Sequence, residues 1–358
     1  MKKTELSLLI FLFSIFSSTS GVLAIESEYI QGVSEKQWQM ISKIGDPLDC
    51  KTRIEELSQL NNGKVITHKD FLDDPWTLNK LIKANKIVTL ESGEYQIKET
   101  ISIPNGHTLI GQSDTIINAS RVSTGIKNSG SVINLTIFQA QKYGIELMSN
   151  ANVFRVVVKH TGINAPSNSQ GNGVHSSGIN SHNNCVVSVE ASHGYNETGG
   201  DCCRRGGNAD GFTVKYGAHD ITFIDTHAHH NSDDGYDFWK GGAGAKIEAN
   251  KPTIRIFYSS ANNNGKNPLT PNGDGNGFKF GSSNEYQKSK GRDLGQRLIY
   301  GSAACWNREK GFDRNKTSTK IVAKNLNASG NKRGYQDVSN FNRQTDPNNV
   351  TCDLFPSK

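Results

Sequence analysis

A glycine followed by a large apolar residue recurs along most of this chain and restricts the folds that it can adopt. The pair occurs at Gly144-Ile145, Gly173-Val174, Gly211-Phe212, Gly235-Tyr236, Gly277-Phe278, Gly311-Phe312 and Gly334-Tyr335. Gly211 and Gly235 are 24 residues apart, and Gly311 and Gly334 are 23 apart. We interpret the longer intervals as the same unit carrying a loop. A unit this short cannot bury its apolar side alone, but it can when it is stacked on copies of itself.

The segments between these glycines have strand composition. Runs such as "SVINLTIFQ", "NVFRVVVKH", "NCVVSVEAS" and "HDITFIDTH" are bounded by turn residues, and helical periodicity is scarce in this part of the chain. We therefore predict an all-β solenoid, a parallel β-helix, in which matching residues of successive coils lie about 4.8 Å apart. The alternative is an antiparallel sandwich or barrel, which would need hairpins with two-residue turns, and these are scarce here.

The two ends of such a solenoid expose sheet edges and need caps. The segments "SEKQWQMISKIG" and "CKTRIEELSQL" have helical spacing, so we expect residues 25–75 to form an N-terminal helical cap. The β-helix would then occupy residues 76–340. The tail, residues 341–358, contains Pro347 and Pro356 and is expected to pack on the other end.

Residues 1–24 have the features of a secretory signal peptide. Lys2 and Lys3 form a basic start, an apolar run follows from Leu6 to Phe16, and "VLA" ends the segment as a small-residue cleavage pattern. The apolar run is too short to span a membrane, and no later segment is long enough. We expect a secreted, soluble monomer without a membrane anchor.

Cysteine content and charge agree with export but leave the partner open. The six cysteines, at positions 50, 185, 202, 203, 305 and 352, suit an oxidising compartment, and their pairing cannot be deduced from the sequence. The formal charge of +6 becomes +5 when Lys2, Lys3 and Glu5 leave with the signal peptide. This excess is compatible with a polyanionic partner and equally with a simple solubility charge. No nucleic-acid-binding motif accompanies it, so we expect no nucleic-acid partner.

Aligning the coils on the glycine pairs places acidic residues side by side. The residue before glycine is Asp210, Asp234, Asn276, Lys310 and Arg333 in turn, and the second residue after it is Thr213, Asp237, Lys279, Asp313 and Gln336. If the aromatic residues Phe212, Tyr236, Phe278 and Phe312 stack inward, the second row must face outward, because side chains alternate along a strand. Glycine lets the chain bend, so the preceding residue can face the same side.

Four carboxylates then converge on one patch, those of Asp210, Asp233, Asp234 and Asp237. Such crowding is unfavourable unless a cation neutralises it, and oxygen ligands without thiolates favour Ca²⁺ over zinc. The alternative is a run of solvated Asp-Gly turns, but two adjacent coils agree in register. The sequence therefore predicts a calcium site.

Lys279 lies one coil further on, in the row of Asp237. A divalent cation beside it disfavours the ammonium form and lowers the pKa of the lysine, which makes it a candidate general base. Arg308, Lys310, Arg314 and Arg333 fall on the following coils, where they could bind further acidic groups of a polymer.

These residues resemble polysaccharide lyase family 9, the calcium-dependent pectate lyases with a right-handed parallel β-helix. The resemblance covers residues 173–340 and rests on "NADGF", "NSDDGYDFW", "GDGNGFKFG" and "GFDRN", in that order. It implies Asp210, Asp233, Asp234 and Asp237 as calcium ligands and Lys279 as the base. The implied reaction is β-elimination in polygalacturonate or a related acidic uronate polymer.

Three other readings remain open at this point. A β-helical glycoside hydrolase of the polygalacturonase type would need a His motif downstream of the paired Asp, whereas "SHG" comes upstream. A non-catalytic polysaccharide-binding β-helix would need neither Lys279 in register nor the acidic cluster. A zinc site at His227, His229 and His230 lacks a Cys or Glu to complete a usual ligand set, so ordinary strand histidines are favoured.

Overall fold

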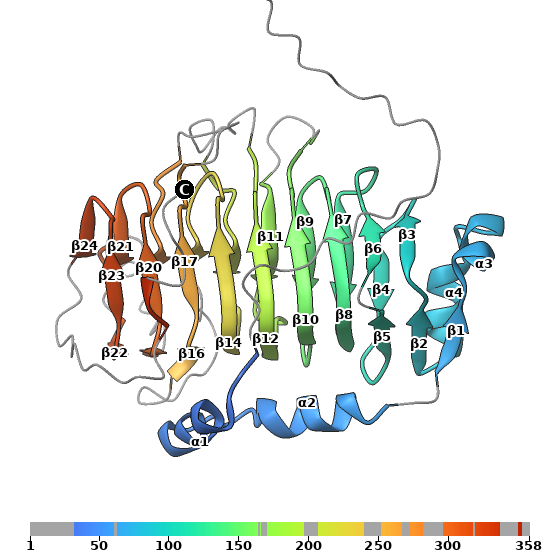
Figure 1. Ribbon diagram of the computed structural model, residues 1–358, viewed down its shortest axis with the longest axis horizontal. Coiled ribbons are helices and arrows are strands. Elements are labelled where there is room, and N and C mark those ends of the chain that lie inside the picture. The colour runs from blue at the N-terminus through green and yellow to red at the C-terminus, as the bar shows by residue number, and fades with distance from the viewer. Residues whose placement is uncertain are drawn as a thin grey trace, which may run out of the picture.

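Parallel strands of successive coils build the molecule (Figure 1). The computed structural model describes residues 32–60, 63–112, 114–163, 165, 170–196, 207–239, 252–266, 273–281, 296–317, 319–336 and 350–352. Within these residues the strands form two sheets, and every pair of neighbouring strands is parallel. The predicted parallel β-helix is confirmed.

The smaller sheet carries one short strand from each coil. Its strands are β4 (Ile101–Ile103), β7 (Thr124–Asn128), β9 (Tyr143–Leu147), β11 (Asn172–Ser177), β13 (Phe212–Lys215), β15 (Tyr236–Asp237), β18 (Phe278–Lys279), β21 (Lys310–Asp313) and β24 (Arg333–Gln336). They pair in chain order, so each strand lies beside the strands of the preceding and the following coil. This is the order that a solenoid requires.

The larger sheet wraps around the remaining sides. Its strands are β1 (Lys64–Ile66), β2 (Ile87–Leu90), β3 (Gly93–Gln96), β5 (Thr108–Gly111), β6 (Thr115–Asn118), β8 (Ser131–Phe138), β10 (Asn152–Lys159), β12 (His182–Ser192), β14 (His219–His229), β16 (Pro252–Phe257), β17 (Ser260–Asn262), β19 (Gln296–Tyr300), β20 (Ala303–Cys305), β22 (Ile321–Lys324) and β23 (Asn327–Ser329). Asn134 lies inside β8 with φ 54°, and Asp225 lies inside β14 with φ 51°. Left-handed residues at these positions turn the strand around a corner of the coil.

An aromatic column fixes the register of the smaller sheet. Phe212 is aligned with Tyr236, Tyr236 with Phe278, Phe278 with Phe312, and Phe312 with Tyr335. Their ring centroids are 4.8, 4.4, 5.0 and 5.4 Å apart in that order, and each pair is stacked. Phe212, Tyr236, Phe278 and Phe312 are fully buried. The predicted inward ladder is confirmed, and with it the register used to align the coils.

An asparagine ladder holds the turns that lead into the site strands. The side-chain amides of Asn231, Asn264 and Asn307 donate to the Oδ1 atoms of Asn264, Asn307 and Asn331, at 3.0, 2.9 and 3.0 Å. The same amides also donate to backbone carbonyls of alanines on the preceding coils. Because Asn231 stands two residues before Asp233, the ladder fixes where the acidic segment begins.

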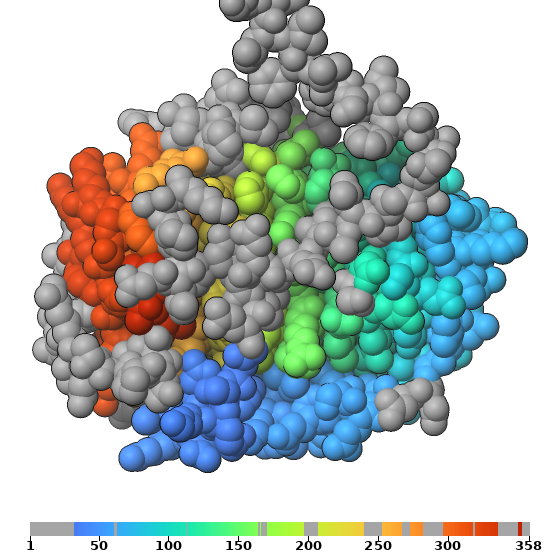
Figure 2. Space-filling model, viewed as in Figure 1, coloured from blue at the N-terminus to red at the C-terminus, as the bar shows by residue number. Residues whose placement is uncertain are grey.

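The two predicted N-terminal helices form, but they do not cap the solenoid. Helices α1 (Glu35–Ile44) and α2 (Cys50–Ser58) lie along the side of the coils in Figure 1, and Figure 2 shows them as a continuous blue band there. Ile41 and Ile54 pack in a buried cluster that includes Val187, Ile224 and Phe257 of the larger sheet. An amphipathic helix needs an apolar surface, and the outer face of this sheet provides one.

Two shorter helices cover the N-terminal end instead. Helices α3 (His68–Asp73) and α4 (Thr77–Ala84) lie at the end marked by β1 in Figure 1. Phe71, Leu78 and Ile82 enter the main hydrophobic core there. Helix α3 thus lies within residues 25–75, the predicted helical cap region, which also contains the first coil strand, β1.

The described part of the chain contains two disulfides. Cys50 pairs with Cys185 and ties α2 to β12, and Cys305 pairs with Cys352 and ties the tail to β20. Val350 and Cys352 belong to the same side cluster as α1 and α2, so this part of the tail packs on the side of the coils. The rest of residues 341–358, Cys202, Cys203 and the predicted signal peptide lie outside the described residues.

No helix in the part of the chain that the structure describes is long and apolar enough to cross a bilayer.

Candidate metal centre

The outward face of β13, β15, β18 and β21 carries the predicted site. Thr213 is aligned with Asp237, Asp237 with Lys279, and Lys279 with Asp313, as the alignment of coils predicted. Asp210 and Asp234 each stand immediately before a glycine, and the next strand begins directly after that glycine. Alternation along each strand puts this row on the face opposite to the aromatic column.

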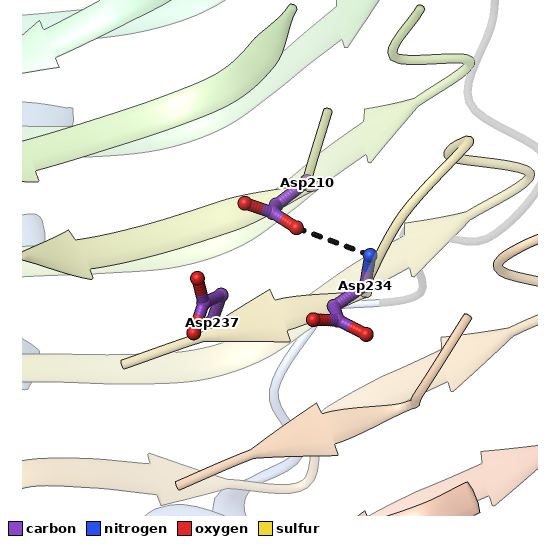
Figure 3. A group of neighbouring side chains, drawn as sticks. All are labelled: Asp210, Asp234 and Asp237. Carbon is purple, nitrogen blue, oxygen red and sulfur yellow. Dashed lines mark hydrogen bonds between the residues drawn. The ribbon is translucent and has the colours of Figure 1, made fainter. Parts of the chain in front are cut away.

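Three carboxylates form the central cluster, those of Asp210, Asp234 and Asp237. One oxygen of each lies within 4.8 Å of the others, and all three residues are buried. Figure 3 shows them on neighbouring coils, with the backbone N–H of Asp234 donating to Oδ1 of Asp210 at 3.1 Å. Like charges at this separation repel each other, so the cluster needs compensating positive charge.

Asp233 faces a second group, which it shares with Asp234 and Asp274. Its two oxygens accept backbone N–H groups, from Asn208 and from Asp274, each at 2.6 Å. Asp274 was not predicted from the sequence. It stands three residues before Gly277, one position further than Asp233 stands before Gly235, and Gly275 with φ 71° accommodates the extra residue. Because of this offset, an alignment of the coils with constant spacing does not match Asp274 with Asp233.

Two lysines supply positive charge to these carboxylates. Lys279 Nζ lies 2.9 Å from Asp234 Oδ2 and 3.1 Å from Asp274 Oδ2. Lys215 Nζ lies 3.2 Å from Asp210 Oδ2 and 3.1 Å from Asp237 Oδ2. Lys215 was also missed, although alternation from Phe212 places it on the outward face, two residues after Thr213.

The carboxylates are difficult to ionise in this environment. Burial, with a smaller contribution from the Asp237 and Asp234 charges, raises the pKa of Asp210 to about 7 although Lys215 opposes the shift. Burial and the charge of Asp210 raise the pKa of Asp233 to about 7. Burial also raises the pKa of Asp234 well above its ordinary value. The centre therefore favours any further cation that offsets its charge.

For Lys279 the structure gives the opposite shift from the predicted one. Burial alone would lower its pKa, but the surrounding carboxylates, Asp234 foremost, outweigh burial and raise the pKa well above its ordinary value. The prediction assumed a divalent cation beside the amine. With protein groups alone, two carboxylates in direct contact stabilise the ammonium form.

The donor set fits a calcium ion. Asp237 Oδ1 and Asn276 Oδ1 are buried and have no hydrogen-bond partner among the described residues. Buried polar oxygens are nearly always satisfied, so these two atoms call for a partner such as a cation. All the available donors are oxygens, and calcium prefers carboxylate and amide carbonyl oxygens over nitrogen or sulfur.

The predicted polymer-binding cations lie on the coils beyond Lys279. Lys310 is aligned with Arg333, and its Nζ pairs with Asp313 Oδ2 at 2.7 Å. Arg308 donates to the carbonyl of Gly273, in the segment that carries Asp274, at 3.2 Å. Arg314 donates to the carbonyl of Thr317 at 2.8 Å, within its own turn. Arg308 thus contacts the segment that carries Asp274, Lys310 and Arg333 lie on the coils that follow Lys279, and Arg314 binds the backbone of its own turn.

The histidines considered for zinc make other contacts. His227 hydrogen-bonds Ser260 Oγ at 2.9 Å and Asp225 Oδ1 at 3.0 Å, and His229 Nε2 lies 3.2 Å from Glu190 Oε1. Among the described residues, the groups of three or more metal-ligating side chains contain only aspartates. This supports the interpretation of His227 and His229 as strand residues, and His230 follows the end of β14.

Comparison with known proteins places the chain in a family. A family model described as "Pel9A-like, right handed beta helix region" matches residues 63–349. Similar solved structures are pectate lyase Pel9A, with 18% identity over 73% of this chain and 70% of that one and a TM-score of 0.46, and a rhamnogalacturonan lyase, with 17% identity over 68% and 64% and a TM-score of 0.43. Another is the A-module of the Azotobacter vinelandii mannuronan C-5 epimerase AlgE4, with 12% identity over 76% and 96% and a TM-score of 0.33. A search of curated proteins gave no match. The match over residues 63–349 shows that the chain belongs to the Pel9A-like right-handed β-helix family.

Proposed function

We propose that this protein is a secreted, calcium-dependent polysaccharide lyase of the pectate lyase type, which cleaves polygalacturonate or a related acidic uronate polymer. The observation that carries the proposal is the position of Lys279 on the outward face, with its Nζ 2.9 Å from a buried aspartate cluster that contains the unsatisfied Asp237 Oδ1. The family is named after Pel9A, which is a pectate lyase, and this agrees with the chemistry of the site.

Asp210, Asp234 and Asp237 would hold the ion, with Asp233 beside them and the amide oxygen of Asn276 as a further donor. Calcium, when bound, would offset the charge of a substrate carboxylate and so stabilise the negative charge that develops when the adjacent carbon loses its proton. The backbone and side-chain N–H groups of Asn276 donate to Asp234 Oδ1 at 2.7 and 2.8 Å and keep this carboxylate oriented.

Lys279 is the proposed base. The carboxylates around it raise its pKa, and a calcium ion held by them would offset their charge and favour the neutral amine. The neutral amine would then take the proton from C5 of a uronate residue, which lies α to the carboxylate. The electron pair of the broken C–H bond forms the C4–C5 double bond, the bond from C4 to the glycosidic oxygen breaks, and water can protonate the leaving oxygen. The side chain of Lys279 is 14% exposed, which leaves its amine within reach of a polymer on this face.

The polymer would run across the coils, parallel to the solenoid axis. Successive coils present equivalent positions about 4.8 Å apart, so a row of side chains can meet successive sugars. Arg308, Lys310 and Arg333 lie on the side of the site towards the C-terminus, and we propose that they bind further carboxylates of the substrate. Arg314 is the weakest member of the predicted set because its guanidinium is held by its own turn.

Incubation with polygalacturonate tests the proposal. A lyase generates a conjugated unsaturated uronate, so ultraviolet absorbance is expected to rise with Ca²⁺ present and to stay flat in chelator. A glycoside hydrolase would produce reducing ends without absorbance, and a binding protein would produce neither. Lys69→Met, which removes an exposed lysine paired with Asp73 on helix α3 at the N-terminal end of the solenoid, is a suitable control and is expected to retain activity. Absence of any absorbance increase across uronate polymers would refute the proposal.

A further inference from the structure

The metal centre contains a buried lysine that the proposed reaction does not use. Lys215 is the last residue of β13, and its side chain is only 4% exposed. Its Nζ bridges Asp210 Oδ2 at 3.2 Å and Asp237 Oδ2 at 3.1 Å. Lys279, by contrast, is more exposed and contacts Asp234 and Asp274. The two ammonium groups therefore serve different carboxylates.

The contacts of Lys215 fix the orientation of the Asp210 and Asp237 carboxylates. Each partner gives Oδ2 to the ammonium, and this leaves Oδ1 of Asp210 to accept the N–H of Asp234 and Oδ1 of Asp237 without a partner among the described residues. A buried, hydrogen-bonded charge pair holds its members in one geometry. Lys215 thus positions the carboxylates and has no direct path to a substrate.

The charges of the inner cluster balance with this lysine included. In their ionised forms Asp210, Asp234 and Asp237 contribute three negative charges, and Lys215 contributes one positive charge. With Lys279 neutral, as the proposed reaction requires, two negative charges remain. A single divalent cation neutralises them. Without the lysine, three negative charges would remain, and one divalent cation would leave the buried cluster with an excess.

We propose that Lys215 is a fixed internal cation that holds the carboxylates of Asp210 and Asp237 in position before the metal binds. Its positive charge also weakens the attraction of the cluster for divalent cations. The identity of the metal as calcium rests on the proposed function, whereas the role of Lys215 in the metal-free protein does not. Lys215 is a positioning residue for the site.

Thermal unfolding in chelator tests the metal-free role. Lys215→Met is expected to lower the melting temperature by about 5 °C or more, because it leaves two buried carboxylates without their counter-charge. Adding Asp237→Asn to Lys215→Met should recover at least half of that loss, since it removes one of the stranded charges. Lys127→Met on the same sheet, where the lysine is half-exposed and 4.0 Å from Glu146, is the matched control and should change little.

A merely structural lysine would give a different pattern. If Lys215 acts only through its aliphatic stem, the double variant will be no more stable than Lys215→Met, and that result overturns the proposal. If Lys215→Met does not fold, the double variant is still expected to fold in chelator, and its failure counts equally against the proposal.

Calcium titration calorimetry tests the effect on the metal. Lys215→Met is expected to bind Ca²⁺ about tenfold more tightly than the native protein, corresponding to the loss of one repulsive charge. Unchanged or weaker binding by a folded variant would refute this part. If the native protein binds no calcium, the proposed function fails, but the comparison in chelator still decides whether Lys215 is the internal cation.

Discussion

Replacing Lys279 separates its two roles, as a base and as an ion-pair partner. Lys279→Met keeps the length of the apolar stem and removes the amine, whereas Lys279→Arg keeps the positive charge but cannot give up its proton at any working pH. Both variants are expected to lose elimination activity. Positioned general bases contribute about 100-fold to 10,000-fold, so we expect rates at least about 100-fold below native.

The two variants should differ in stability. Breaking a fully buried ion pair costs about 3–5 kcal/mol, because an uncompensated charge is left behind. The cost at Lys279 is smaller: its side chain is 14% exposed, and Asp234 Oδ1 keeps two hydrogen bonds from Asn276. The partner Asp274 is 68% exposed and adds about 1 kcal/mol at most. We therefore expect Lys279→Met to lose about 2–3 kcal/mol of unfolding free energy in chelator, and Lys279→Arg to lose less.

Urea unfolding in chelator and absorbance assays on polygalacturonate with Ca²⁺ measure these two quantities. If Lys279→Met retains more than a few per cent of the native rate, the base lies elsewhere and the mechanism is wrong. If Lys279→Met is as stable as the native protein, the contact with Asp234 contributes nothing in solution. Loss of activity in Lys279→Arg, with a smaller loss of stability than in Lys279→Met, is the combination that the proposal predicts.

Three further predictions concern the metal, the core and the histidines. Chelator should abolish activity and Ca²⁺ restore it, with Mg²⁺ much less effective, and Asp237→Asn should raise the calcium concentration required. Phe278→Ala removes a buried ring stacked on both sides and should lower the unfolding free energy in urea by about 4 kcal/mol, whereas Phe278→Leu should cost clearly less. Burial, aided by the Lys215 and Lys142 charges, lowers the pKa of His175 to about 3. The unfolded chain binds that proton near pH 6.5, so stability falls as pH drops below this value, by about 2 kcal/mol from pH 7.5 to pH 5 for this residue. His175→Gln should reduce the measured fall by that amount, and an equal fall in both chains would refute the assignment.

The register could be predicted because glycine is a steric requirement at six of the seven pairs, Gly334 being the exception. A Cβ on Gly211 would lie 2.7 Å from the Ala228 Cβ and 2.8 Å from the Gly235 carbonyl oxygen, and a Cβ on Gly235 would meet the Gly277 carbonyl at 2.7 Å. The coils approach too closely there for any side chain. A periodic glycine therefore indicates where successive coils stack closely. For this reason the aromatic column and the aspartate row could be predicted from the sequence.

The place of α1 and α2 could not be predicted in the same way. Their spacing indicates an apolar face, but it does not say which apolar surface receives that face. A signal was present in "NCVVSVEAS", where Cys185, Val186 and Val187 are consecutive apolar residues. Such a run indicates a strand buried on both faces, and Val187 is indeed buried in the cluster beneath the helices.

Lys215 and Asp274 were missed for different physical reasons. Alternation assigns Lys215 to the outward face, but a long flexible side chain can point along its own coil or across to the next, and only packing decides that it bridges Asp210 and Asp237. Asp274 depends on a backbone offset at Gly275, which alignment by constant spacing cannot detect. Rows of short side chains are therefore predictable from register, whereas lysine contacts and bulges are not.

The aromatic core and the proposed metal centre depend on the same strand register, and each disfavours a shift of that register. A shift of one residue in β15 would turn Tyr236 outward and drive Asp237 into the aromatic column, because side chains alternate with a period of two. The first change gives up two stacked contacts, with Phe212 and Phe278, and the second buries a carboxylate without Lys215. Both changes are unfavourable, so the repulsive acidic row helps to specify the register that the aromatic column stabilises. A protein built in this way can keep crowded carboxylates on and beside a two-residue strand, since the neighbouring coils rather than the strand itself hold them in position.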